Sequence, residues 1–186
     1  MEREFGCIKR IEIPDEWIET PDQSTPLFQM WTFHPQSIEE IEFCVFQRRQ
    51  GVTLEDMQIF RATLNKGEHR IEESGAELLA LTPILGNAGN NQWSNKAKGI
   101  DGPNFRFTRG DVKMLNGRPV LYVTGSFIDP ESKKSLNEYR GIFVDTGSDS
   151  NDVQEIYLQV AASKGYFEFE KFAKAYEKAL ATINWQ

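Results

Sequence analysis

The segment 141–153 reads GIFVDTGSDSNDV and places a carboxylate where an apolar run ends. The residues before Asp145 are typical of a β-strand, and the residues after it are the small and polar types that form turns. A carboxylate at the end of a strand can hydrolyse peptides when a second carboxylate shares a proton with it across a water molecule. Asp145 is therefore the first residue to consider as a catalyst.

The tetrapeptide Asp145-Thr146-Gly147-Ser148 resembles the catalytic loop of pepsin-like and retroviral aspartic proteases. The sequence contains one such loop, so a second carboxylate would have to come from another copy of the chain, and no glycine-rich flap or apolar-Gly segment follows Ser148. We therefore interpret the segment as two strands and an acidic turn. A cation loop that includes Asp149 remains a third interpretation, although the EF-hand pattern fails at Ile156.

Histidine and cysteine give little further support for catalysis. His34 and His69 have no partner at metal-ligand spacing, so we expect neither a metal nor another cofactor. Cys7 and Cys44 lie in strand-like, apolar segments, and we expect two buried thiols instead of a disulfide. A nucleophilic pair of Cys44 and His34 is conceivable in space, but nothing in the sequence lowers the pKa of that thiol.

The irregular Gly/Asn-rich loop 86–103 is the part of the sequence that most favours a binding surface. Long irregular loops in small domains are commonly functional. Trp93 offers an aromatic platform, and Asn91 and Lys96 are polar neighbours, so we predict a partner-binding site at Asn91, Trp93 and Lys96. The alternative is that Trp93 anchors the loop on the core.

Composition restricts the class of partner and the compartment. The chain has 28 acidic and 21 basic residues, a formal net charge of −7, and no stripe of lysine and arginine. A negative surface repels phosphate backbones, so we expect no nucleic-acid partner. No apolar run is long enough to cross a bilayer, and the N-terminus lacks the apolar core of a signal peptide, so we expect no membrane association and a cytoplasmic location.

Most of the chain shows the alternation and turn residues of β structure. The expected strands cover 7–13, 27–33, 41–49, 104–115, 120–127, 139–144 and 153–162. In 104–115 the apolar parity changes, which predicts a bulge near Gly110. Asn116-Gly117 predicts a two-residue hairpin turn, because both residues tolerate a positive φ. In 153–162 only one parity is consistently apolar, so we expect a sheet with one covered face.

Two helices stand out. The first follows a capping box of Thr53 and Asp56, and a weaker helix covers 73–81. The last spans about 167–183 and carries an apolar stripe at steps of three and four, which favours packing against a sheet. We find no repeat or linker and expect a single domain, 1–186. The predicted fold class is α+β, a single antiparallel β-sheet on which the C-terminal helix and the helix after the N-terminal strands pack as an α/β sandwich.

This layout resembles the PsbP-like α/β sandwich superfamily. The resemblance is carried by the N-terminal strand group and its helix, by the strand entered through NGRPVLYVTG at 116–125, and by the final strand and helix, YLQVAASKGYFEFEKFAKAYEKALATINW. That superfamily includes photosystem-associated extrinsic proteins, small bacterial lipoprotein domains and a eukaryotic protein that binds the GTPase Ran. The resemblance implies a scaffold for binding or assembly and supplies no catalytic residues.

We conclude from the sequence that the chain is a non-catalytic protein-binding or assembly-factor domain with an unknown protein partner. The alternative is a small-ligand-binding protein or enzyme with a site between helix and sheet. A core filled by side chains would favour the first interpretation, and a buried pocket with converging polar groups would favour the second.

Overall fold

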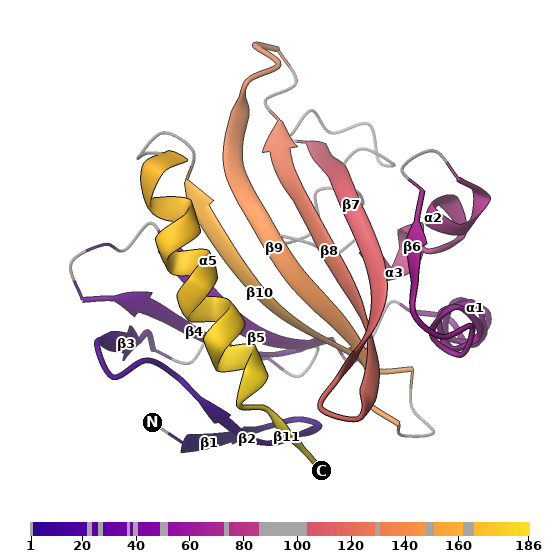
Figure 1. Ribbon diagram of the computed structural model, residues 1–186, viewed down its shortest axis with the longest axis horizontal. Helices are drawn as coiled ribbons and strands as arrows, with labels where there is room; N and C mark the ends of the chain where they lie inside the picture. Colours follow the sequence, from indigo (N-terminus) through magenta and orange to yellow (C-terminus); the bar gives the residue numbers. More distant parts are fainter. Residues whose placement is uncertain are drawn as a thin grey trace.

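The computed structural model describes residues 2–21, 24–25, 28–36, 38, 41–48, 52–72, 75–85, 104–128, 131–147, 151–161 and 166–186. Within these residues the chain forms two antiparallel sheets and several helices (Figure 1). The predicted loop 86–103, with Asn91, Trp93 and Lys96, lies outside the described residues. The α+β class is confirmed.

The large sheet has the strand order β3-β4-β5-β10-β9-β8-β7-β6. Each described neighbour pair is antiparallel. Its strands are β3 (Trp17–Glu19), β4 (Phe28–Pro35), β5 (Ile41–Arg48), β6 (His69–Ile71), β7 (Asn104–Leu115), β8 (Arg118–Ile128), β9 (Ser135–Asp145) and β10 (Val153–Ala161). The six longer strands are those expected from the sequence, whereas the short edge strands β3 and β6 were not predicted.

A second, smaller sheet corrects the prediction of a single sheet. It contains β1 (Glu2–Phe5), β2 (Ile8–Glu12) and β11 (Asn184–Trp185) in the order β1-β2-β11. Both ends of the chain meet in this sheet, as Figure 1 shows. The expected strand 7–13 is thus the second half of a hairpin. A strand of two residues is too short to carry a periodic pattern, so no sequence pattern indicated that β11 pairs with β2.

Helices cover both faces of the large sheet, which corrects the expectation of one covered face. The C-terminal helix α5 (Tyr166–Ala181) lies across β10, β4 and β5 in Figure 1. On the other face lie α1 (Leu54–Leu64), α2 (Ala76–Ala80) and α3 (Thr82–Leu85). Glu155 and Tyr157 of β10, expected on an open face, are 2% and 4% exposed. The Tyr139 hydroxyl donates to Glu155 at 2.5 Å, which satisfies one carboxylate oxygen of this buried acid.

Local signals placed the turns and caps correctly. Thr53 accepts from the Asp56 amide and donates its own amide to the Asp56 side chain, the expected capping box. Asn116 and Gly117 have φ of 49° and 84°, as a tight hairpin turn requires. The register between β7 and β8 shifts between Phe107 and Arg109, so the bulge expected near Gly110 is present.

The aromatic stripe of α5 forms the seam of one core. Tyr176 packs edge-on against Phe43 of β5 at a centroid distance of 5.5 Å, and its hydroxyl donates to the Ile156 carbonyl at 2.7 Å. Trp17 contacts both Phe43 and Phe172 with centroids about 6 Å away. These contacts tie helix α5, the sheet and the short strand β3 together.

We predict that Phe43→Ala will lower the free energy of unfolding by about 3–5 kcal/mol, because it removes a fully buried ring and leaves a cavity among aromatic partners. Chemical denaturation followed by circular dichroism measures the change. Leu79→Ala is the matched control, since Leu79 is 76% exposed and its loss should change stability by less than about 0.5 kcal/mol. Equal effects of the two substitutions would contradict this packing.

Cys7 and Cys44 are free and buried, as expected. Burial raises the pKa of Cys7 to about 11 and that of Cys44 to about 12. Each thiol therefore stays protonated in the folded chain at pH 8. As the pH rises above the ordinary thiol pKa of 9.0, the unfolded chain loses its thiol protons while the folded chain keeps them. The free energy of unfolding therefore falls from about pH 9 until the folded thiols also ionise, at about pH 11 for Cys7 and about pH 12 for Cys44.

We predict that iodoacetamide at pH 8 will modify both thiols at least about a hundredfold more slowly in the native protein than in denaturant, because both the thiolate and access are suppressed. Mass spectrometry over time gives the two rates. Rapid labelling of the native chain would show that at least one cysteine is accessible.

Candidate functional site: a groove beside helix α5

Asp145, the first catalytic candidate from the sequence, is engaged in structural contacts. Asp145 ends β9, and the guanidinium of Arg61 on α1 binds its carboxylate through Nε at 2.9 Å and Nη2 at 3.2 Å. The Gly147 amide also donates to Asp145 Oδ1 at 3.2 Å. A catalytic dyad needs a second carboxylate in this place. Among the described residues the printed side-chain partner is an arginine, and Arg61 contacts both carboxylate oxygens of Asp145 where a second carboxylate would have to lie.

The acidic turn after Asp145 joins β9 to β10, as predicted. Thr146 donates to the Asp152 carbonyl at 3.2 Å, and the Gln47 amide donates to the Asp152 side chain at 3.4 Å. Asp149 lies outside the described residues. In the part of the chain that the structure describes, no group of three or more histidine, cysteine or acidic side chains is arranged to hold a metal ion.

The remaining candidates are also engaged in structural contacts. Thr32 donates to Cys44 Sγ at 3.7 Å, and the raised pKa keeps this thiol protonated at neutral pH. The His34 ring contacts the Pro35 carbonyl, while His69 Nε2 lies 3.2 Å from Glu77. These contacts do not assemble a nucleophile with its base.

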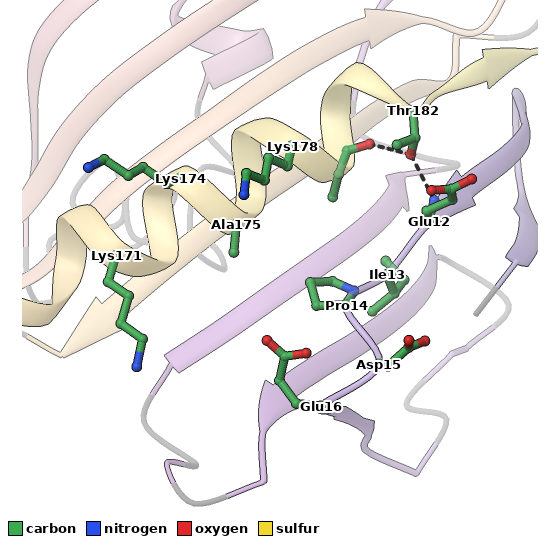
Figure 2. A pocket seen from close by; sticks show the side chains of 11 residues that line it. Glu12, Ile13, Pro14, Asp15, Glu16, Lys171, Lys174, Ala175, Lys178 and Thr182 are labelled. Carbon is green, nitrogen blue, oxygen red and sulfur yellow. Dashed lines mark hydrogen bonds between the residues drawn. The ribbon is translucent and has the colours of Figure 1, made fainter.

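A surface groove of about 790 Å³ lies between α5 and the turn that joins β2 to β3 (Figure 2). The helix wall carries lysines at positions i, i+3 and i+7, a spacing that places them on one side of the helix. In Figure 2 Lys171 and Lys178 extend toward the opposite wall, and Lys174 extends along the helix. The opposite wall is acidic. The lining residues are Glu12, Ile13, Pro14, Asp15, Glu16, Lys171, Lys174, Ala175, Lys178, Ala179 and Thr182.

Buried neighbours hold the acidic wall in place. Trp17 follows Glu16 directly and inserts its ring between Phe43 and Phe172, leaving it 5% exposed. Ile13 is 3% exposed on the other side of the turn. The Trp17 amide donates to the Pro14 carbonyl at 3.0 Å, which closes the turn. Asp15 and Glu16 are thereby fixed at the surface between two buried anchors.

A hydrogen-bonded link joins the two walls at one end of the groove. The Glu12 amide donates to Thr182 Oγ1 at 2.9 Å, and Thr182 Oγ1 donates to the Ala179 carbonyl at 2.7 Å. Further along, the three lysines and the residues Asp15 and Glu16 are exposed. The dashed lines of Figure 2 belong to the Thr182 link, and none joins a drawn lysine to a drawn acid. The groove thus keeps two separate, oppositely charged walls.

The sequence contained a signal for this groove. Lys171, Lys174 and Lys178 have i, i+3, i+7 spacing, which places them on one face of the C-terminal helix. The acidic wall had no such signal, because Asp15 and Glu16 read as ordinary turn residues. Their position opposite the lysines depends on how β2 and β3 approach α5.

Comparisons with known proteins identify the fold alone. No protein-family model matches the sequence, and a search of curated proteins finds no match. Among solved structures, the chain is similar to the solution structure of cyanobacterial PsbP (CyanoP) from Synechocystis sp. PCC 6803, with a TM-score of 0.56 and 8% sequence identity. The similarity covers 95% of this chain and 86% of that chain. The chain therefore has a PsbP-like fold, in agreement with the layout of its strands and helices.

Proposed function

We propose that the protein is a non-catalytic domain that binds a protein partner, or assists an assembly, through the groove between α5 and the turn 12–16. The observation that carries the proposal is the pair of oppositely charged walls, which face one another and remain exposed. Such side chains contribute little to folding stability. They do provide complementary charge for a partner, and electrostatic complementarity gives specificity and fast association.

The packing between α5 and the sheet supports a surface site over a buried one. The ring of Phe172, the ring of Tyr176 and the side chain of Leu180 are 5%, 1% and 2% exposed and belong to one continuous core. A small ligand held between helix and sheet would need that space. The alternative of a small-ligand protein or enzyme with a site there is therefore less well supported.

The groove indicates the chemistry of the partner. Three lysines and three acids line it, so its lining has no excess of either charge, and one of the acids, Glu12, is paired with Arg10 at 2.8 Å. The acidic wall and the net charge of −7 would both repel a polyanion such as nucleic acid. The lysines span about 10 Å along the helix axis. A polypeptide segment with acidic residues toward the lysines and basic residues toward Asp15 and Glu16 fits both walls.

The proposal includes a cytoplasmic location. Cys7 and Cys44 are both free, which is typical of proteins in reducing compartments. Among the described helices, none is sufficiently long and apolar to cross a membrane.

We predict that Lys174→Glu with Lys178→Glu will abolish partner capture, because reversing two charges turns attraction into repulsion on one wall. Affinity capture from the native host with quantitative mass spectrometry identifies the proteins that the wild type retains and this variant loses. Each candidate is then purified and its affinity measured directly, and we expect binding to weaken as ionic strength rises.

The matched control is Lys133→Glu with Lys134→Glu, which makes the same change in net charge on the exposed turn between β8 and β9. A partner of the groove must bind this control as it binds the wild type. A partner that both variants lose reflects overall charge, and a partner that neither loses binds elsewhere. Either result would reject the groove as the binding surface.

A further inference from the structure

A second, smaller pocket lies where β8 begins and β9 ends. It has a volume of about 240 Å³ and opens beside the Asp145 turn, apart from the residues that line the groove. Two arginines and one acid supply its charge. The lining residues are Arg61, Leu64, Asn65, Arg118, Pro119, Asp145 and Gly147.

The first arginine is already paired. Arg61 holds Asp145 with two hydrogen bonds, and the side chains of these residues are 32% and 22% exposed. The two charges therefore offset one another in a fixed geometry. The Gly147 amide adds a third donor to the same carboxylate and holds the turn against it.

The second arginine is in a different situation. The guanidinium of Arg118 lies over the ring of Trp185, 5.3 Å from its centroid. A Cβ placed on Gly147 would lie 3.3 Å from Arg118 Nη2, so that nitrogen lies close to the turn that borders the pocket. Arg118 Nη1 is buried and has no hydrogen-bond partner among the described residues. Within that part of the chain no carboxylate forms an ion pair with this guanidinium, whose side-chain hydrogen bond is with the Cys7 thiol.

A buried guanidinium nitrogen without an acceptor is unusual, because desolvated donors are nearly always satisfied. Arg118 is also fixed by its contact with Trp185, and a guanidinium held in place loses less entropy when it binds an oxyanion. The charges of Arg61 and Asp145 cancel, so the pocket retains one positive charge.

We propose that this pocket binds a small oxyanion, a phosphate or a carboxylate, with Arg118 as its principal ligand. The guanidinium is planar and matches two oxygens of either group. Leu64 and Pro119 line the pocket and leave room for a few carbon atoms. The volume is below that of sites for drug-sized molecules and well above that of one water molecule. The proposal does not depend on the groove beside α5.

We predict that inorganic phosphate will bind the full chain at this pocket. Nuclear magnetic resonance of the ¹⁵N-labelled protein, at an ionic strength held constant with sodium chloride, follows the Nε–H signals of Arg118 and Arg61. We expect a saturable shift of the Arg118 signal. A parallel titration with acetate separates the two sources of oxyanion: a tighter response to phosphate assigns a phosphate site, and a tighter response to acetate assigns a carboxylate site.

Arg118→Gln should weaken binding by about tenfold or more, the effect of losing one charge-assisted pair, as read from backbone amide shifts around Gly147. Arg70→Gln is the matched control, because Arg70 is exposed on β6 and its loss makes the same change in charge. Arg118→Lys keeps the charge without the planar fork, and we expect intermediate affinity. If the glutamine variant does not fold, Arg118→Lys is the variant whose affinity is compared with that of the wild type.

Shifts that rise linearly to the highest phosphate concentration would overturn the proposal, since they show weak association without a site. The same conclusion follows if Arg118→Gln or Arg118→Lys binds as tightly as the wild type, or if Arg70→Gln weakens binding equally. Circular dichroism of each variant establishes that the compared proteins are folded.

Discussion

The structure depends on the burial of both faces of the eight-stranded sheet. Strand β10 shows the constraint clearly: Ile156 and Leu158 lie in the core beneath α5, while Val153 and Tyr157 lie in the core beneath α1, α2 and α3. The central strands must therefore supply apolar side chains on both faces of the sheet, at odd and at even positions alike. Polar residues within them are accepted only with partners, as when Tyr139 donates to Glu155.

The same constraint fixes how the chain ends are attached. Gln154 of β10 accepts from the Cys7 amide at 2.9 Å and donates to the Phe5 carbonyl at 3.0 Å, so one buried amide fastens the small sheet to the large one. Asn116 donates to the Ala181 and Ile183 carbonyls and binds the β7–β8 turn to the end of α5. With both faces covered, charged side chains at the borders of the layers remain for binding, and both proposed sites lie there.

Much of the local structure could be predicted from short stretches of sequence. The capping box at Thr53 and Asp56 and the turn at Asn116-Gly117 were correct, because the residues that determine them are adjacent in the chain. The helix at the C-terminus was also correct, because its stripe repeats over several turns. The single sheet was wrong, and the site predicted at Trp93 lies outside the described residues. Neither proposed site was predicted.

By itself, the sequence determined the turns, the caps, the long strands and the amphipathic helix, since each depends on neighbouring residues. Only the tertiary structure decided what Asp145 does, because its partner Arg61 is 84 positions away and belongs to another element. The sequence motif of a catalytic loop is present, but the side chain that binds Asp145 is the positively charged Arg61. The groove and the anion pocket depend in the same way on contacts between distant segments, which a local pattern cannot contain because folding alone brings those segments together.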